Sequence, residues 1–406
     1  MKGALNGLRV LDLTRVLAGP SCTQMLGDMG ADVIKVERPG AGDDTRKWGP
    51  PFLDRRQGGS SKESAYYLSA NRNKRSIAID ISKPQGRDLV LQLLAECDIL
   101  VENYKVGDLE RYGLSYGQLK DRFPGLVYCS ITGFGQTGPY AKRAGYDFLA
   151  QGMGGIMSLT GEPRGEPVKV GIGNADLITG LYAGFAILSA LRHRDRTGQG
   201  QHVDMALLDC QLALMTYEAE NYLLSGEAPQ RRGNGHPNIV PYQVFRAADG
   251  YLILAVGNDG QFAKFCEFAG CPELAADSRF ATNPARLKHR EELIPQIADI
   301  VVRHPRAHWL DGLESRGVPA GPVNTLPETF EDPQVKARGM VVHADHLYRD
   351  AVPLLNSPIH MSETPPQVRL APPVLGQHTR AILDEMLGLN GEAVESLIAS
   401  GIVEQA

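Results

Sequence analysis

The sequence predicts an α/β protein with a doubly wound, mostly parallel sheet in a large domain and a second, smaller α+β domain. A chain of 406 residues is long enough for two or three domains at roughly 100–200 residues each. Strand-like and helix-like segments alternate over residues 1–205, a pattern typical of parallel sheets covered by helices. After residue 226 the pattern changes to a hairpin followed by helices.

Segments rich in Val, Ile and Leu between turn residues predict the strands, and apolar spacings of three to four residues predict the helices. The first βαβ unit combines two strands, a turn at Ala18–Pro20 and a helix within about 30 residues. In chain order, the large domain has strands at 8–13, 32–37, 76–81, 99–103 and 126–131 and helices at 21–29, 85–97 and 115–123. Residues 1–205 are therefore expected to form a Rossmann-like ligand-binding domain.

The remaining segments complete the predicted organisation. A helix at 176–194, a strand at 201–205 and a linker helix at 206–225 come next. The small domain, 226–325, contains hairpin strands at 242–246 and 251–256 and helices at 261–269 and 290–302. Residues 326–406 begin with a return linker that has six prolines between 353 and 373, which favours an extended chain. Its helices at 379–386 and 392–400 are too short to be stable alone, so we expect them to dock on the large domain.

Composition excludes several classes of protein. With 43% hydrophobic and 22% charged residues, the chain is close to the globular average. A net charge of -5 lacks the positive charge of a general nucleic-acid binder. The six cysteines form no C-x-x-C pair, so neither a metal site nor a redox motif is expected. The first twelve residues do not resemble a secretory signal, and the longest apolar stretch is shorter than a membrane span, so we expect a cytoplasmic protein.

One carboxylate stands out by its position. Asp176 follows a strand-like, glycine-containing segment, Val170–Asn174, at the point where the predicted helix begins. Unpaired N–H groups and the helix dipole favour a charged carboxylate there, so we expect a pKa at or below the ordinary value of about 3.9. Such an ionised group suits a nucleophile. A purely structural role is the alternative, because Asp is a preferred N-cap residue.

Basic side chains gather near predicted strand ends and loops, where ligands of open α/β sheets bind. These residues are Arg15, Arg38, Lys74, Arg75, Arg111, Lys142 and Arg143. They are compatible with a phosphate-rich ligand. Ordinary solvated charges are the alternative.

Six segments carry a resemblance to a known family. They are LDLTRVLAGP at 11–20, GADVIKVERP at 30–39, NKRSI at 73–77, VENY at 101–104, SITGFG at 130–135 and TGQGQHVD at 197–204. Together they resemble the family III CoA-transferases of the CaiB/BaiF type, from about residue 5 to the C-terminus. Within the family, the closest likeness is to the succinyl-CoA:glutarate branch, through GAGDDTR at 40–46, WGPP at 48–51 and IVPY at 239–242.

The resemblance implies a role for several residues. It makes Asp176 the nucleophile. The residues that it assigns to CoA binding are Arg15, Val16, Ala18, Arg38, Lys74, Asn103, Tyr104 and Arg111. The loop over the acyl site corresponds to 232–236, with Gly233 and Gly235, although it lacks the longer glycine run of formyl-CoA transferase. His236 and Arg46 are the residues expected to bind the distal carboxylate of a dicarboxylate substrate.

The resemblance also implies the activity and the assembly. The family moves CoA from an acyl-CoA such as succinyl-CoA to an acid such as glutarate, through an aspartyl mixed anhydride and an aspartyl-CoA thioester. It needs CoA thioesters as substrates and no permanently bound cofactor or metal. The family fold is an interlocked homodimer of ring-like subunits, which accounts for a proline-rich segment that wraps.

Three alternatives stay open. In the first alternative, the acid that accepts CoA is itaconate, oxalate or carnitine instead of glutarate. In the second, the protein is a 2-methylacyl-CoA racemase, but racemases have a His before the Asp where this chain reads Tyr146-Asp147. Tyrosine, with an ordinary pKa of about 10, is a poor base at neutral pH. In the third, the protein binds CoA without catalysis, which does not account for the intact Asp176.

Overall fold

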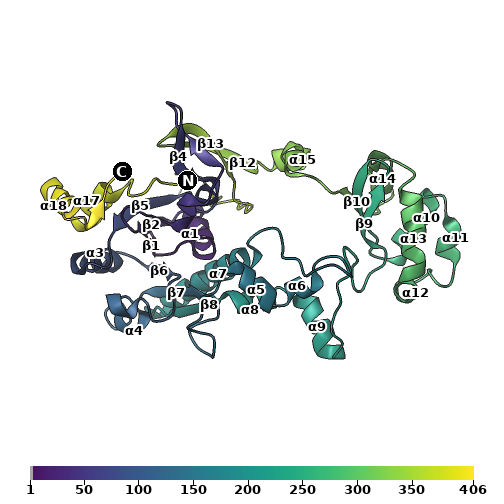
Figure 1. The fold of residues 1–406 in the computed structure, drawn as a ribbon, viewed down its shortest axis with the longest axis horizontal. Coiled ribbons are helices and arrows are strands. Elements are labelled where there is room, and N and C mark those ends of the chain that lie inside the picture. The colour runs from purple at the N-terminus through teal and green to yellow at the C-terminus, as the bar shows by residue number, and fades with distance from the viewer. Residues whose placement is uncertain (1–2) are drawn as a thin grey trace. The chain divides into compact units, whose positions relative to one another are not determined.

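The computed structural model describes residues 3–406, which divide into two compact units (Figure 1). The first unit comprises residues 3–156, 169–226 and 338–406, and the second comprises 157–168 and 227–337. The chain therefore passes between the units four times. The second unit begins near the predicted boundary at residue 226, but it extends to Ala337 and includes 157–168, which we expected in the large domain.

A seven-stranded sheet forms the centre of the first unit, in the order β14-β5-β2-β1-β6-β7-β8. Its strands are β1 (Arg9–Asp12), β2 (Asp32–Glu37), β5 (Lys74–Ile79), β6 (Ile99–Glu102), β7 (Val127–Thr132), β8 (His202–Ala206) and β14 (Val403–Glu404). Every neighbouring pair is parallel except β14 with β5 at one edge. Because the chain extends the sheet in both directions from β1, the loops after β1 and β6 lie together at its carboxyl edge.

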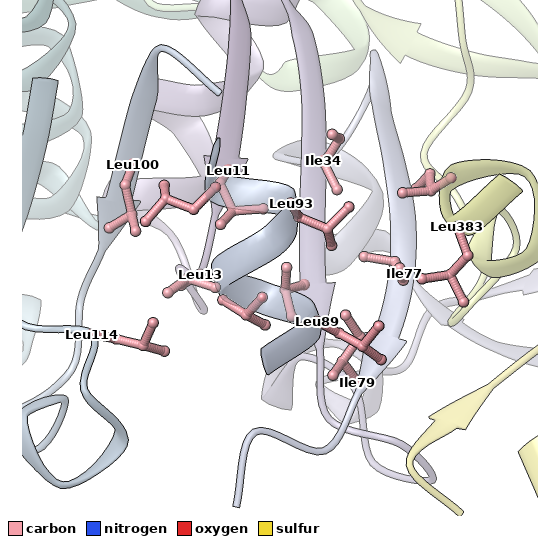
Figure 2. Packing of buried hydrophobic residues seen from close by; sticks show 14 of the residues in the cluster. Leu11, Leu13, Ile34, Ile77, Ile79, Leu89, Leu93, Leu100, Leu114 and Leu383 are labelled. Carbon is pink, nitrogen blue, oxygen red and sulfur yellow. The ribbon is translucent and has the colours of Figure 1, made fainter. Parts of the chain in front are cut away.

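Helices cover both faces of this sheet, as the alternating sequence pattern predicts. One face packs against α3 (Pro84–Ala95), α4 (Tyr116–Leu119), α17 (Thr379–Leu387) and α18 (Gly391–Ala399), and the other against α1 (Ala18–Asp28), α5 (Asp147–Met153), α7 (Asn174–Thr197) and α8 (Leu207–Ala213). Successive residues of β1 point to opposite faces of the sheet. Val10 is buried in the hydrophobic core on one face and Leu11 in the core on the other. In Figure 2, Leu89 of α3 and Leu383 of α17 pack in the same cluster as Leu11 and Ile77 of the sheet.

Shorter elements complete the first unit. They are β3 (Phe52–Asp54), β4 (Ser60–Ser64), α2 (Ala65–Ser69), α9 (Thr216–Ser225), β12 (Val341–His346) and β13 (Arg349–Leu355), with α6 (Ile156–Leu159) at the boundary and 3₁₀-helices at Asp44–Lys47 and Glu110–Tyr112. The hairpins β3–β4 and β12–β13, which the sequence pattern did not predict, share a small core of Leu53, Val352 and Leu354. After Leu355 the chain has no helix or strand until Thr379, as its prolines predict.

The second unit is a small α+β module. Its antiparallel sheet has the order β11-β10-β9. The predicted hairpin is present, but its turn is Ala248–Asp249, one residue before the predicted Asp249–Gly250, because Gly250 already pairs with Ala247. The elements are β9 (Tyr242–Ala247), β10 (Gly250–Ala255), β11 (Ala320–Pro322), α10 (Asp259–Phe268), α11 (Pro272–Ala276), α12 (Asn283–Lys288), α13 (Arg290–Val301), α14 (Arg306–Glu314), α15 (Leu326–Glu331) and α16 (Pro333–Ala337). Phe262, Phe265 and Trp309 are fully buried in its core.

The helix α7 contains Asp176 in its first turn and is the longest helix among the described residues, with 24 residues. Over residues 3–406 it is also the one helix long and apolar enough to cross a membrane, but half of its apolar window is buried within the protein. The central helix of a globular core has the same length and composition, so this is weak support for a membrane span.

Candidate active site

A cavity of about 240 Å³ opens at the carboxyl edge of the large sheet. The loops after β1, β6 and β7 and the first turn of α7 form its walls. Its lining residues include Arg15, Val16, Ala18, Asn103, Tyr104, Lys105, Arg143, Tyr146 and Asp176. Ligands of open parallel sheets bind outside the carboxyl ends of the strands, so this cavity has the expected place for a ligand.

Asp176 lies in the first turn of α7 and lines this cavity. The N-cap of the helix is Gly173, so Asp176 is not the N-cap residue that the alternative interpretation of the sequence required. Among the described residues, none donates a hydrogen bond to the Asp176 carboxylate. The side chain is mostly buried and lacks the partners that a structural cap has.

The first turn of α7 is capped instead by Asp147, at the start of α5. The Oδ1 atom of Asp147 accepts hydrogen bonds from the N–H groups of Ala175 at 2.7 Å and Asp176 at 3.2 Å. The buried side chain of Gln151 donates to Asp147 Oδ2 at 2.7 Å and to the carbonyl of Ile172 at 3.2 Å. A second carboxylate is therefore held at the positive end of α7, where it interacts with the helix dipole.

This arrangement determines the ionisation of Asp176. Burial, and then the neighbouring charge of Asp147, raise the pKa of Asp176 to about 7. The predicted pKa at or below about 3.9 is therefore wrong. Asp147 already occupies the helix terminus and repels a second negative charge beside it. Asp176 therefore exchanges its proton near neutral pH, and its ionised form, a poorly solvated carboxylate, is a stronger nucleophile than one in water.

Tyr66 of α2 is a further group close to the two carboxylates. Burial, and then the charges of Asp176, Asp147 and Asp43, raise the pKa of Tyr66 to about 12. Its hydroxyl therefore stays protonated at neutral pH and can donate a hydrogen bond. The ring of Trp48 packs edge-to-face on Tyr66, with the centroids 5.1 Å apart. Sequence reasoning missed Tyr66 because nothing near it in the chain indicates a site.

Five of the residues that the family resemblance assigns to CoA line the same cavity as Asp176: Arg15, Val16, Ala18, Asn103 and Tyr104. The side chain of Asn103 joins two loops, since its Oδ1 accepts from the Arg15 N–H at 2.9 Å and its Nδ2 donates to the Arg15 carbonyl at 2.7 Å. Val16 has a φ of 71°, which is costly for a β-branched residue. Asn103 thus helps to hold a strained loop beside the cavity.

Lys74 is placed away from any ligand. It is fully buried, and its Nζ donates to Asp12 Oδ2 at 3.1 Å, to the Pro20 carbonyl at 2.9 Å and to Asn71 Oδ1 at 2.9 Å. An ammonium group has three donors, so none is left for a phosphate. The prediction that Lys74 contacts CoA is wrong, because this side chain holds the interior of the sheet together.

Arg46 is also committed to the protein itself. Its Nη2 lies 2.8 Å from Glu37 Oε2, its Nη1 lies 2.5 Å from Glu63 Oε2, and the side chain is only 4% exposed. The guanidinium additionally donates to the Tyr67 hydroxyl at 2.6 Å. The prediction that Arg46 binds the distal carboxylate of the substrate is wrong, because two carboxylates of the protein already neutralise it.

Arg38 and Arg111 lie on the surface and are not among the residues that line the Asp176 cavity. Arg38 directly follows β2, and Arg111 lies in the second 3₁₀-helix. The Arg111 guanidinium lies over the Tyr112 ring, 4.8 Å from its centroid, and 4.0 Å from Asp108 Oδ1. Both arginines are open to solvent, and their contact with CoA stays a prediction.

The predicted acyl-site loop, 232–236, belongs to the second unit. Gly233 has a φ of 60°, and its N–H donates to the Gly161 carbonyl at 3.1 Å. His236 accepts a hydrogen bond from the Asn238 N–H at its Nδ1, at 3.0 Å. The roles of His236, Gly233 and Gly235 toward the acyl group stay predictions.

The structure adds two cations to the Asp176 cavity. Arg143 lies over the rings of Phe134, at 5.3 Å, and Tyr140, at 4.4 Å, and Lys105 follows Tyr104 in the loop after β6. The sequence placed Arg143 among basic residues near strand ends but assigned it no role. For Lys105, the available signal was its position directly after the VENY motif.

Comparisons with known proteins identify the family of this chain. Residues 5–379 match the family described as CoA-transferase family III. The chain is 50% identical over 385 residues to a succinate–glutarate CoA-transferase of Agrobacterium fabrum, covering 95% of this chain and 96% of that protein. It is 47% identical over 406 residues to a succinyl-CoA:glutarate CoA-transferase of Mus musculus, covering 99% and 90%. The crystal structure of a CAIB/BAIF family protein from Brucella suis has a TM-score of 0.85 at 51% identity, covering 95% of this chain and 100% of that one. The chain therefore belongs to CoA-transferase family III.

Proposed function

We propose that this protein transfers CoA from succinyl-CoA to glutarate, or to another C4–C6 dicarboxylate, with Asp176 as the nucleophile. The observation that carries this proposal is a partly buried carboxylate with a pKa of about 7 in the cavity formed by the loops after β1 and β6. The names of the Agrobacterium fabrum and Mus musculus relatives support the pair of substrates.

The reaction needs only carboxylates and a thiolate. Asp176 attacks the thioester carbonyl of succinyl-CoA, the C–S bond breaks, and a mixed anhydride and CoA thiolate result. The thiolate then attacks the aspartyl carbonyl, which releases succinate and leaves an aspartyl-CoA thioester. Glutarate attacks this thioester and forms a second mixed anhydride. The returning thiolate attacks its glutaryl carbonyl, so glutaryl-CoA leaves and the Asp176 carboxylate is regenerated.

The surroundings of Asp176 favour the first step. A partly desolvated carboxylate held beside the thioester avoids the cost of orienting and desolvating it during the reaction. The N–H groups of Ala175 and Asp176 already donate to Asp147, so they are not available to the oxyanion. We propose the protonated Tyr66 hydroxyl as an oxyanion donor instead.

The phosphates of CoA require cations near this cavity, and the described residues offer several. Arg15, Lys105 and Arg143 line the cavity, and Arg38 and Arg111 are exposed on the same unit. We propose that these five cations bind the phosphates of CoA, without a contribution from the buried Lys74. Positive side chains at strand ends position phosphate groups through charge-assisted hydrogen bonds.

Exposed apolar side chains support the proposal of an interlocked homodimer of ring-like subunits with a Rossmann-like large domain. On α7, Leu181, Phe185 and Leu188 are exposed at helical spacing, and on α9, Leu223 and Leu224 are 71% and 86% exposed. Apolar surface of this kind marks interaction sites. Sedimentation equilibrium is expected to give twice the chain mass of 44.1 kDa. A monomer at micromolar concentration contradicts the homodimer.

A 2-methylacyl-CoA racemase is the second candidate, because a carboxylate with a pKa of about 7 also suits proton transfer. Racemisation needs a second acid–base group, and the cavity has Tyr146 at the position where racemases have a histidine. Incubating 2-methylacyl-CoA with the enzyme in D₂O separates the two reactions. Exchange of the α-proton supports the racemase, and its absence together with CoA transfer supports the transferase.

The decisive experiment is an acceptor screen with succinyl-CoA, with mass spectrometry of the CoA thioesters. Glutarate is expected to be used much faster than butyrate, because a site built for a charged group loses its pairing when that group is missing. Equal rates with the two acids contradict the dicarboxylate specificity. Use of oxalate, itaconate or carnitine alone keeps the transferase and changes the acceptor.

The absence of a resident cofactor or metal and a cytoplasmic location remain part of the proposal. The mechanism uses CoA thioesters as substrates and requires no other group. Full activity after dialysis against a chelator, and recovery of the enzyme in the soluble fraction of its cells, test these two points.

A further inference from the structure

A polar cluster with no part in the proposed reaction crosses three neighbouring strands of the large sheet. Glu102 of β6 lies opposite Ser130 of β7 in the parallel register, and both are buried. The Ser130 Oγ lies 2.9 Å from Nε2 of His202, the first residue of β8. The Ser130 hydroxyl also favours the ionised form of the Glu102 carboxylate. One hydroxyl can donate to this carboxylate and accept from Nε2 of His202 at the same time.

Glu102 connects this cluster to the Asp176 cavity. Its Oε2 accepts a hydrogen bond from the N–H of Tyr104 at 2.8 Å. The intervening residue, Asn103, binds the backbone of Arg15 through two hydrogen bonds. Tyr104, Asn103 and Arg15 all line the cavity. The Glu102 carboxylate is therefore one of the polar contacts that hold the loop after β6 beside the cavity.

A second cavity of about 210 Å³ lies next to this loop. Glu102, Ser130 and His202 line it, and it shares Lys105 and Val106 with the Asp176 cavity. Residues 105–106 therefore lie between the two cavities. The second cavity also gives solvent protons a route to Glu102.

We propose that Glu102, supported by Ser130 and His202, is a positioning residue that holds segment 103–106 in place for CoA binding and releases it when protonated. This inference rests on the proposed function, because it takes the Asp176 cavity as the CoA site. The step is a proton transfer only: solvent protonates the Glu102 carboxylate, and the neutral acid is a weaker acceptor for the Tyr104 N–H.

The charges around Glu102 place this switch near neutral pH. Burial raises the pKa of Glu102 to about 7, opposed by the hydrogen bonds from Ser130 and the Tyr104 N–H and assisted by the charge of Asp204. The other titratable or charged groups that face the cluster are His202, Tyr104, Tyr116, Tyr128, Cys129, Lys105 and Glu110. Burial lowers the pKa of His202 and raises those of Tyr104, Tyr128 and Cys129. Glu102 is therefore the carboxylate of this cluster whose pKa burial brings into the range between pH 6 and 8.

The affinity for CoA is expected to fall as the pH falls. Above pH 7 the ionised carboxylate holds the loop, and CoA binds with its full affinity. As the pH falls through 7, the acid form loosens the loop and the affinity falls. If CoA binding shifts the pKa of Glu102 by up to one unit, the dissociation constant changes by up to about tenfold.

The test measures binding without chemistry, in a protein whose nucleophile no longer titrates. Calorimetric titrations with free CoA at pH 6, 7 and 8 compare Asp176→Asn with Asp176→Asn/Glu102→Gln. The phosphate of CoA also titrates in this range, with a pKa near about 6, but it is the same in both experiments. Between pH 6 and 8, the gain in affinity of Asp176→Asn is expected to exceed that of the double variant by about three- to tenfold.

A matched pair at Ser130 separates positioning from a general loss of structure. In the Asp176→Asn background, Ser130→Ala removes a donor to the charged carboxylate, so the pH dependence is expected to move to higher pH. Ser130→Thr keeps the hydroxyl and is expected to restore the original profile. Equal loss of affinity at every pH in Ser130→Ala contradicts a positioning role.

Three outcomes overturn the inference. The same pH dependence with and without Glu102→Gln overturns the role of Glu102 and leaves the proposed transferase intact. Failure of folded Asp176→Asn to bind CoA at any pH overturns the CoA site itself, and the inference with it. If thermal unfolding shows that the Glu102→Gln protein is not folded, the Ser130 variants provide the test. Identical dependence of CoA affinity on pH in Ser130→Ala and Ser130→Thr overturns the inference.

Discussion

Two aspartates in the first unit, Asp12 and the partly buried Asp176, have opposite ionisation behaviour. Asp12, the last residue of β1, is fully buried, and its Oδ2 lies 3.1 Å from the Lys74 ammonium. Burial opposes its ionisation, but Lys74 and Lys35 and two threonine hydroxyls outweigh burial and lower the pKa of Asp12 to about 2. Asp176 has no such partners, and burial together with Asp147 raises its pKa to about 7.

The difference shows how the same residue type serves structure in one place and chemistry in another. Around Asp12, every charge is paired: Lys35 lies 3.0 Å from Asp43, and Arg46 binds Glu37 and Glu63. Side chains paired in this way hold the surrounding loops in place, but none of them is free to react. Asp176 is left unpaired beside a cavity, which costs folding free energy when it is ionised and keeps it reactive.

The largest effect is expected at Asp176. Asp176→Ala removes the atom that attacks the thioester, so the rate of CoA transfer should fall by at least about 10³-fold. The matched control is Asp195→Ala, an exposed aspartate at the other end of α7, which should retain activity. Steady-state assays and mapping of the hydroxylamine-modified residue after incubation with acyl-CoA provide the measurement. Normal turnover by Asp176→Ala, or modification elsewhere, removes Asp176 as the nucleophile.

Stability provides a second readout on the same variant. The pKa of Asp176 is raised in the folded state, so its ionisation destabilises the fold progressively as pH rises to about 7. Asp176→Ala should therefore be no less stable than the parent at pH 8, as measured by urea unfolding. A large loss of stability shows that Asp176 has a structural role.

Replacing Asp12, in contrast to replacing Asp176, is expected to destabilise the fold. Asp12→Asn leaves the buried ammonium group of Lys74 without its carboxylate partner, whereas Lys35 keeps Asp43, and the change should lower the free energy of unfolding by about 3–5 kcal/mol. The parent keeps this contribution above the ordinary pKa of about 3.9 and loses it as pH falls through the folded value. Asp44→Asn removes an exposed pair with Arg15 and should cost at most about 1 kcal/mol. Equal losses in the two variants contradict the distinction drawn between them.

The regular elements of the large sheet were predictable because their patterns are local. The strand Asp32–Glu37 is observed with its predicted bounds, and α7 contains the whole predicted helix. The hairpin β12–β13 was missed because its residues are largely exposed, and Pro353 lies within β13. A short, exposed strand has little hydrophobic alternation for sequence analysis to detect.

The site was predicted in part, for a physical reason. A glycine-containing turn before a helix indicated Asp176, but its capping partner Asp147 comes from a helix earlier in the chain, so no local pattern revealed the raised pKa. Lys74 and Arg46 were assigned to ligands because the sequence does not show which cations are already paired. Their carboxylate partners, Asp12 for Lys74 and Glu37 for Arg46, become visible only in the folded protein.

A smaller effect is expected from Asp147. Asp147→Asn keeps an oxygen that can accept from the α7 N–H groups but removes the charge that repels ionised Asp176. The pKa of Asp176 should fall, and the acidic limb of the kcat/KM profile should move down by about 1 pH unit. Asp147→Ala also removes the cap, so it should additionally cost about 0.5–2 kcal/mol of stability. An unchanged limb in Asp147→Asn shows that burial alone raises the pKa.

The smallest effect is expected at Arg38, which sharpens the contrast between exposed and buried cations. Arg38 is exposed after β2, whereas Lys74 is enclosed, so only Arg38 can reach a phosphate of CoA without disturbing the sheet. Arg38→Ala should raise KM for succinyl-CoA by about 3–10-fold and leave kcat within about twofold, because phosphate anchoring contributes equally to ground and transition states. Arg122→Ala, an exposed arginine that lines neither described cavity, is the control and should leave both constants unchanged. If KM is unchanged in Arg38→Ala as well, the phosphates are bound by cations of the cavity itself, such as Arg143, and exposure alone does not identify a ligand.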